Sequence, residues 1–408
     1  MSQHPATLPL ESVRDLMAPG APLPFRVIDA QGRLLLAQGQ CVQDVRQLKA
    51  LLERGACVVY ADVEVVRQAR EQSGGSSSSA APSTRKLTWF DRWERHIWDI
   101  DDALRQVGRD PAAAPLLAQL VQQQMALVTS QPDAALFTLL RQDGKRMALY
   151  ALSHARHTAL VVQLTTGLLG WAADRVHCAV AVALTMNASI VELQARMADQ
   201  ADQADPPSKK QMDQIRAHPA KSAEMLRASG ITDAEWLTGV EDHHEHKGAG
   251  GYPRGIDAPG ELACVVRAAD VYAAKLSPRA LRPALPPQDA VRQLFQEDPG
   301  SSLAAALIRA VGLYPPGNLV RLKNGESGIV VRRASAGTGT AVGAAVGAAV
   351  GAIVGAEVAV LVTAAGKAVT GGPRRDTAQA QFAIAGAMVD RSAVPRVLPE
   401  QVFGLIYA

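Results

Sequence analysis

The chain has 408 residues, of which 48% are apolar and 4% aromatic, and it carries 42 Lys and Arg against 39 Asp and Glu. This length predicts two or three domains, whose cores are built mostly from Ala, Leu and Val. A net charge of +3 is too small to indicate nucleic-acid binding, and four dispersed cysteines do not suggest a disulfide framework. The first residues lack the basic start and apolar run of a signal peptide, so we expect a cytoplasmic protein.

Residues 1–70 are predicted to form a small mixed α/β domain. A turn-like sequence around Gly32 separates two apolar stretches, which favours a β-hairpin. Apolar side chains then recur at helical spacing over 45–52, and a strand is predicted at 56–60. The next segment, 71–88, is rich in Ser, Gly and Pro and is interpreted as a linker.

Residues 89–312 are predicted to form an all-α domain. The run 116–121 places its apolar residues on one helical face, and 158–164 is a second apolar run without glycine. Pro and Gly cluster at 206–207 and 248–260, where loops are expected.

Residues 313–408 are predicted to form a small β-rich domain. Two β-type runs flank Lys323-Asn324-Gly325-Glu326, and Asn-Gly is the strongest short signal for a hairpin. Further strands are predicted at 357–363 and 381–384. The fold expected for the whole chain is therefore multidomain, with a helical domain between a mixed α/β domain and a β-rich one.

An Ala/Gly repeat is inserted into the β-rich domain at 337–356, with glycines four residues apart from Gly343 to Gly355. It has three interpretations: a loop between strands, a helix packed through its glycines, or a membrane span. The apolar part, 341–356, is shorter than the roughly 20 residues that a bilayer requires. Because strands are predicted on both sides, the loop is favoured and no membrane span is expected.

The candidate chemistry lies in Asp242-His243-His244-Glu245-His246 and in the small-residue loop that ends at Gly251-Tyr252-Pro253. Adjacent imidazoles at a helix end can face one pocket, and imidazole binds Fe, Zn and Ni, although such a pair alone is more often a surface feature. Asp270 is a single carboxylate in an apolar helical run and needs a cation or strong donors if it is buried. Pairing with Arg267, one turn away, is the structural alternative.

Two earlier histidines complete the set of candidates. His154 lies on a helix that is predicted to begin near Met147, and His218 precedes Pro219 at a predicted helix start. Either one alone is more often a structural residue than a metal ligand.

The order His154, His218, His243-His244-Glu245, Gly251-Tyr252-Pro253, Asp270 resembles the HD-GYP branch of the HD phosphohydrolase superfamily. That resemblance implies an all-helical core, a centre of two or three metals, usually iron or manganese, and hydrolysis of the bacterial second messenger cyclic di-GMP. Ser277-Pro278-Arg279 matches a Ser-x-Arg of the family. The resemblance implies that five residues are metal ligands: His154, His218, His243, His244 and Asp270. It implies a substrate or partner loop made of Gly251, Tyr252, Pro253 and Arg279.

This sequence departs from the family pattern at the His-Asp dyad, where Met186 and Asn187 stand instead. Other family residues are replaced by Tyr150, Ile190, Gly248 and Ala273. Neutral Asn bridges metals poorly, and a thioether does not suit Fe(II) or Mn(II). The surviving ligands are adequate for one Fe or Mn ion, whereas a full two- or three-metal centre is not expected.

Three functions are open on this basis. The first, favoured because the dyad is missing beside an intact GYP, is a catalytically impaired regulatory or scaffold module. Such a module would bind cyclic di-GMP, one metal, a diguanylate cyclase or another signalling protein. The second is an active cyclic di-GMP phosphodiesterase with a reduced metal site, and the third is a structural adaptor. Nucleic-acid binding is not expected.

Overall fold

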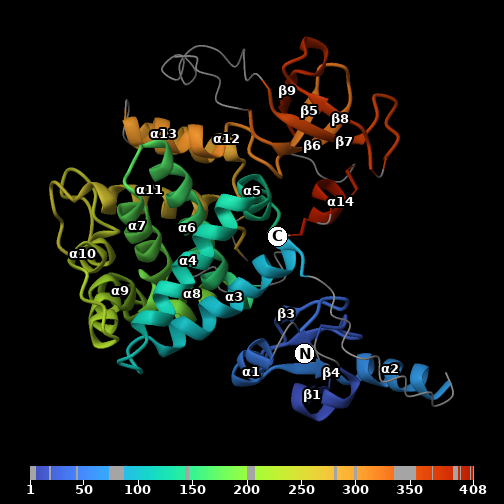
Figure 1. Ribbon diagram of the computed structural model, residues 1–408, viewed down its shortest axis with the longest axis horizontal. Coiled ribbons are helices and arrows are strands. Elements are labelled where there is room, and N and C mark those ends of the chain that lie inside the picture. The colour runs from blue at the N-terminus through green and yellow to red at the C-terminus, as the bar shows by residue number, and fades with distance from the viewer. Residues whose placement is uncertain are drawn as a thin grey trace.

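The computed structural model of the protein describes residues 6–17, 20–42, 45–72, 87–142, 147–199, 207–279, 283–297, 301–334, 355–369, 371–388, 394–395, 397–404 and 406–407. In this part of the chain, two small antiparallel sheets lie beside a large helical body (Figure 1). The chain runs from the N-terminal sheet, drawn in blue, through the helices to the C-terminal sheet, drawn in orange and red. A helical body with small β regions is thus confirmed, while the exact domain boundaries stay a prediction.

The N-terminal sheet has the strand order β1-β4-β2-β3. Its strands are β1 (Thr7–Pro9), β2 (Val27–Ile28), β3 (Leu34–Leu36) and β4 (Cys57–Val59), and they are accompanied by η1 (Leu10–Leu16), α1 (Val45–Glu53) and α2 (Tyr60–Gln72). The predicted hairpin is confirmed, because β2 pairs with β3 and Gly32 has a φ of 79° in the turn between them. A glycine adopts this left-handed conformation without steric cost.

Helix α2 was not predicted. The strand expected at 56–60 ends at Val59, and Tyr60 already begins the helix. The segment is mostly polar, and few of its side chains are buried, chiefly Val63. The apolar residues therefore recur only weakly at helical spacing. The helix reaches Gln72, inside the segment interpreted as a linker, and residues 73–86 of that segment lie outside the described residues. At the other end of that segment, Thr88 caps the helix that begins at Trp89.

The helical body contains α3 (Trp89–Gln106), α4 (Ala114–Ser130), α5 (Pro132–Leu140), η2 (Met147–Leu149), α6 (Tyr150–Leu168), α7 (Ala173–Thr185), η3 (Ala188–Ile190), α8 (Val191–Asp199), α9 (Lys209–Ala228), α10 (Ala234–Asp242), α11 (Glu261–Leu276), α12 (Pro287–Glu297) and α13 (Ser302–Val311). Helix α6 is buried along most of its length and packs against α7, α11 and α13 (Figure 1). The apolar runs predicted to be helical lie in α4 and α6. The body is therefore arranged around α6, which carries His154.

The helix start predicted at Pro219 is wrong. Helix α9 begins ten residues earlier, at Lys209, where the hydroxyl of Ser208 accepts a hydrogen bond from the backbone N–H of Gln211. A proline often marks the first turn of a helix, because its missing N–H has no partner there in any case. Here Pro219 lies inside the helix, where the loss of that N–H has a local consequence described below.

One cluster of buried apolar side chains extends from the N-terminal sheet into the helical body. Phe25 and Leu51 belong to it on one side, and Trp89 and Ile97 belong to it on the other. The guanidinium of Arg54, at the end of α1, also donates two hydrogen bonds to the buried carboxylate of Asp101 on α3, at 2.6 and 2.9 Å. The N-terminal region is thus part of the same hydrophobic core as the helices.

The C-terminal sheet has the order β8-β7-β6-β5-β9. Its elements are β5 (Leu319–Leu322), β6 (Ser327–Arg332), β7 (Glu357–Val362), β8 (Arg374–Asp376), η4 (Ala380–Phe382), β9 (Ile384–Ala387) and α14 (Pro399–Phe403). The Asn-Gly hairpin is confirmed, because β5 pairs with β6 and Gly325 has a φ of 88°. The strand predicted at 381–384 is wrong: it is mostly the 3-10 turn η4, since β9 begins only at Ile384. Most of the Ala/Gly repeat, 337–354, lies outside the described residues.

The helical stretch Ala173–Ala198 is strongly apolar. By length and hydropathy, Ala173–Ala198 is long and apolar enough to cross a membrane, yet 67% of its apolar window is buried inside the molecule. It consists of α7 and α8, joined through η3, and α7 packs against α6 and α10. Such burial is the pattern of a core helix.

Candidate metal site and ligand loop

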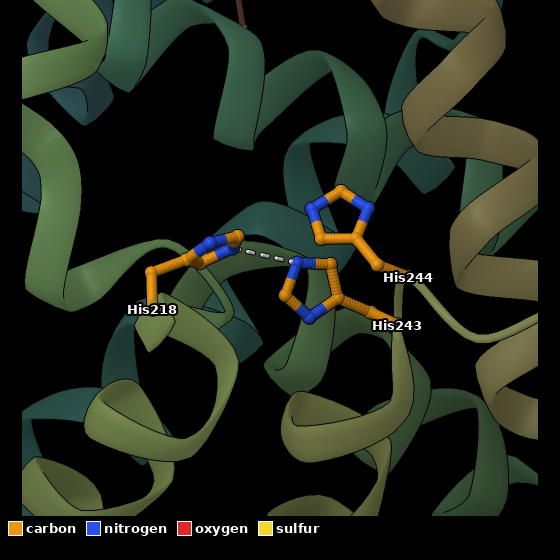
Figure 2. A group of neighbouring side chains, drawn as sticks. All are labelled: His218, His243 and His244. Atoms are coloured by element: carbon orange, nitrogen blue, oxygen red, sulfur yellow. Dashed lines mark hydrogen bonds between the residues drawn. The ribbon is translucent and has the colours of Figure 1, made fainter. Parts of the chain in front are cut away.

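Three imidazoles lie together where α9 faces the end of α10 (Figure 2). His218 comes from α9, while His243 and His244 follow directly after α10. The Nε2 atoms of His218 and His243 are 3.0 Å apart, and each of the three rings offers a nitrogen within 4.8 Å of the others. His218 and His243 are fully buried, so the cluster is enclosed by protein on that side.

The ring of His218 is oriented by the proline that follows it. Pro219 has no N–H, so the carbonyl of Ile215, four residues before it, lacks its usual helical partner. That carbonyl lies 2.5 Å from Nδ1 of His218, which donates to it. The hydrogen bond places the proton on Nδ1 and leaves the lone pair of Nε2 directed into the cluster.

The ring of His243 is held in the same way at a helix end. Its Nδ1 lies 2.7 Å from the carbonyl of Val240, one of the carbonyls that has no partner within α10 because the helix ends at Asp242. With Nδ1 as donor, Nε2 of His243 is also an acceptor. Two lone pairs that face each other at 3.0 Å repel unless a cation lies between them or one ring changes its proton.

The donor set fits a single metal ion. Two nitrogens bound to one ion at about 2.1 Å, with angles between 90° and 109°, are separated by about 3.0–3.4 Å. The separation of 3.0 Å between His218 and His243 falls at the lower end of that range. Neutral imidazole nitrogens are the form that binds Fe, Zn and similar ions.

Burial keeps the three rings neutral. It is the largest effect on each, lowering the pKa of His218 to about 3 and the pKa of His244 well below its usual value. Burial also lowers the pKa of His243, and the charge of Asp270 partly offsets this change. At neutral pH the cluster therefore presents uncharged ligands beside one carboxylate.

The two other expected ligands bind each other. The Nε2–H of His154, on α6, donates to Oδ1 of Asp270, on α11, at 2.6 Å. Burial alone would raise the pKa of Asp270, but this hydrogen bond and the nearby histidines hold the pKa well below its ordinary value. Arg267, the alternative partner expected for Asp270, lies 3.6 Å from Glu297 instead. The five expected ligands thus divide into a group of three histidines and a histidine–carboxylate pair.

Glu245 organises the loop that follows the histidines. Its carboxylate is completely buried and accepts hydrogen bonds from the backbone N–H groups of Arg254 at 2.7 Å, Gly255 at 3.1 Å and Ile256 at 2.9 Å. The guanidinium of Arg254 also reaches back to Asp242. This role of Glu245 was not predicted from the sequence; the signal for it is a carboxylate placed just before a loop whose backbone amides have no partner in a helix or strand.

The small residues of the loop allow close approach of backbone. A Cβ on Gly251 would lie 2.5 Å from Cα of Glu245 and 2.6 Å from the carbonyl oxygen of His244, which is too close for any side chain. The next residue, Tyr252, stacks on His244 with ring centroids 4.5 Å apart. Its peptide bond to Pro253 is cis. The loop and the histidine cluster are therefore one continuous surface.

Comparison with known proteins gives the site its context. No protein-family model matches the chain. A cyclic di-GMP phosphodiesterase of Pseudomonas aeruginosa, PA4108, is 32% identical over 126 residues, which are 29% of this chain and 30% of that protein. The chain is related to the HD-GYP family. A solved HD-GYP-type protein of Bdellovibrio bacteriovorus, Bd1817, is similar over 74% of this chain and 97% of its own length, with a TM-score of 0.48 and 12% identity.

The two residues expected at the positions of the HD-GYP dyad, Met186 and Asn187, are buried. Met186 is fully buried within the hydrophobic core, and it follows directly on α7. Asn187 is also buried, and its Oδ1 has no hydrogen-bond partner within the described part of the chain. Neither residue supplies the charge that the dyad of an HD-GYP enzyme provides.

Arg279 is separated from the rest of the expected ligand loop. Its Nε donates to the hydroxyl of Tyr150 at 2.9 Å, and its guanidinium lies 5.2 Å from the centre of that ring. Tyr150 in turn stacks parallel to His154, with centroids 5.8 Å apart. Among the described contacts, Arg279 therefore lies near the His154–Asp270 pair and not near Gly251–Pro253.

Replacing Pro219 with alanine tests the orientation of His218. The variant regains a backbone N–H that competes with Nδ1 of His218 for the carbonyl of Ile215, so any metal should bind about 10–100-fold more weakly. The same change should stabilise α9, because alanine is favoured over proline by up to about 3 kcal/mol inside a helix. Titration with Mn(II) and urea unfolding measure the two effects. Glu224→Ala, on an exposed position of α9, is the control, and equal metal affinity in all three proteins would contradict this role.

Proposed function

We propose that the protein takes part in bacterial cyclic di-GMP signalling as a catalytically impaired, HD-GYP-like regulatory or scaffold module of the cytoplasm. The observation that carries this proposal is the cluster of His218, His243 and His244 beside an ordered Gly251–Pro253 loop. The relation to a cyclic di-GMP phosphodiesterase supports the ligand class, although the matched part spans only 30% of that protein. Diguanylate cyclases or other signalling proteins are the proposed partners.

The arrangement of the carboxylates supports impaired catalysis. Asp270 is engaged by His154, and Asn187 stands where a charged bridge between metals would be needed. We therefore assign His218, His243 and His244 to one ion of Fe or Mn, with His154 and Asp270 as its immediate surroundings. Such an ion, when bound, polarises a phosphoryl oxygen, but a clamp on both the attacking and the leaving oxygen requires two metals.

The ligand loop supports retained binding. Glu245 holds the backbone of the loop through its side chain, and Tyr252 presents an aromatic ring next to His244. A guanine base can stack on such a ring, and stacking of a base on an aromatic side chain contributes about 1–3 kcal/mol. Recognition of the dinucleotide is therefore separable from its hydrolysis in this site.

An active phosphodiesterase with a reduced metal site is the second candidate. It is favoured by the neutral, converging nitrogens of His218 and His243, which are suited to hold an ion near a substrate phosphate. Both candidates are expected to bind cyclic di-GMP, and only the second is expected to hydrolyse it.

The deciding experiment measures binding and turnover on one preparation. Protein loaded anaerobically with Fe(II) or Mn(II) should bind cyclic di-GMP in calorimetry, hold no more than one ion per chain, and release neither the linear dinucleotide nor GMP. Tyr252→Ala should weaken binding about tenfold through the lost stacking, while Tyr60→Ala, an exposed tyrosine far from the loop, should not.

The outcomes separate the alternatives. Clear formation of linear dinucleotide rejects the impaired module and supports the active phosphodiesterase. A failure to bind cyclic di-GMP with or without metal rejects both, and leaves the structural adaptor.

A further inference from the structure

A large cavity lies between the N-terminal sheet and the helical body. Its volume is about 760 Å³, within the range of pockets that hold small-molecule ligands. The hairpin residues Asp29 and Arg33 line one side, α3 lines another, and the residues from Ala188 to Arg196, together with one face of α9, line the rest. None of the three clustered histidines lines it.

Part of the charge in this cavity is already neutralised. Arg33 pairs with the buried Asp29 at 2.5 Å, and the buried Asp101 accepts hydrogen bonds from Arg54 at 2.6 Å and from Arg105 at 3.1 Å. The Asp29–Arg33 pair is neutral, whereas Asp101 with Arg54 and Arg105 keeps a net charge of +1. The Arg54–Asp101 pair links the N-terminal region to helix α3.

Three other cations of the cavity have no such partner. Arg109 follows α3, Arg196 lies on α8 and Lys221 on α9, and the described residues form no ion pair or hydrogen bond with their side-chain charges. Of the lining carboxylates, Glu53 is paired with Lys49 at 3.7 Å, which leaves Glu192. The cavity therefore has an excess of positive charge from elements that are far apart in sequence.

The same cavity offers an apolar wall. Leu104 of α3, Ile190 and Leu193 beside η3, and Met225 of α9 line it. A phosphate alone would use only the cations, and an apolar ligand would use only this wall. A nucleotide carries both a flat heterocycle and phosphate charge, and so it matches both features.

We propose that this cavity binds a purine nucleoside di- or triphosphate, with its phosphates at Arg109, Arg196 and Lys221 and its base against the apolar wall. The proposal is independent of the function assigned to the histidine cluster. The cavity nevertheless borders that cluster, because Ser189 of its wall donates from its hydroxyl to the carbonyl of His218 at 3.1 Å. A nucleotide bound here would contact the N-terminal hairpin and the helix that carries His218 at the same time.

Calorimetry on the full-length protein with ATP and with GTP tests the proposal, in buffer that contains EDTA so that the histidine cluster holds no metal. At least one nucleotide should bind with a stoichiometry of one, and inorganic pyrophosphate should compete with it. Lys221→Gln and Arg196→Gln should each weaken binding about tenfold, as expected for the loss of a charge-assisted hydrogen bond. Both side chains are exposed at the cavity wall, so the fold should be retained.

Two controls make the result specific. Lys210→Gln removes the same charge from an exposed position on the same helix, outside the cavity, and should leave the affinity unchanged. The double variant His243→Ala/His244→Ala should also bind the nucleotide normally. Absence of saturable binding by both nucleotides overturns the proposal. It is overturned equally by a loss in Lys210→Gln as large as in Lys221→Gln, or by loss of binding in the double histidine variant.

Discussion

Replacing His243 and His244 together by alanine is expected to remove any metal that the protein retains after purification. The two rings supply two of the three nitrogens that converge at the end of α10, and His218 alone is not a sufficient ligand set. Metal content measured by inductively coupled plasma mass spectrometry should fall from at most one ion per chain to background.

The neighbouring histidine provides the control. In His246→Ala the metal content should equal that of the unchanged protein, because the Nδ1 of His246 faces the carbonyl of Lys247 and its ring packs against Gly250. An unchanged metal stoichiometry in the double variant would mean that the ion is bound elsewhere. It would also remove the basis for assigning the site to this cluster.

Replacing Glu245 by alanine is expected to lower the free energy of unfolding by roughly 2–4 kcal/mol. The substitution leaves the backbone N–H groups of Arg254, Gly255 and Ile256, which lie in a partly buried loop, without their acceptor. A fully buried unsatisfied group costs about 1–3 kcal/mol, and water offsets part of that cost here. Urea denaturation followed by circular dichroism measures the change, read from the midpoint at constant slope.

A surface glutamate on the preceding helix is the matched control. Glu241 pairs with the exposed Arg227, and such surface pairs contribute less than about 1 kcal/mol. Glu241→Ala should therefore be nearly as stable as the unchanged protein. If Glu245→Ala were no less stable than Glu241→Ala, the loop would have to be held by other contacts.

Local signals predicted the parts of the fold that depend on a few neighbouring residues. Both hairpins follow from glycines, Gly32 and Gly325, that occupy left-handed turn positions. The loop around Gly251 was likewise predicted, because small residues and a proline interrupt the helical pattern from Gly248 onward. Such features are encoded within four to six residues of sequence.

The features that were missed depend on contacts between distant segments. The contact of Asp270 with His154, 116 residues away, was not predicted, because the local alternative that the sequence offered was Arg267, which lies near Glu297 instead. Pro219 was predicted to start a helix, which is a common position for proline. Its effect inside α9 depends on the ring of His218, which binds the carbonyl of Ile215, and the sequence alone does not show this contact. Arg279 matched a family motif, yet its contact with Tyr150 is set by how α6 and the end of α11 pack.

The shared hydrophobic core of the N-terminal sheet and the helices has a consequence for how the protein can be divided. The Ser/Gly/Pro sequence at 73–85 looks like a suitable place to divide the chain into two modules, for example to build a chimera. A cut there would leave Phe25 and Leu51 on one fragment and Trp89 and Ile97 on the other, each with its apolar surface open to water. A chimera that exchanges the N-terminal sheet and the helices together is therefore expected to be more stable than one divided between them.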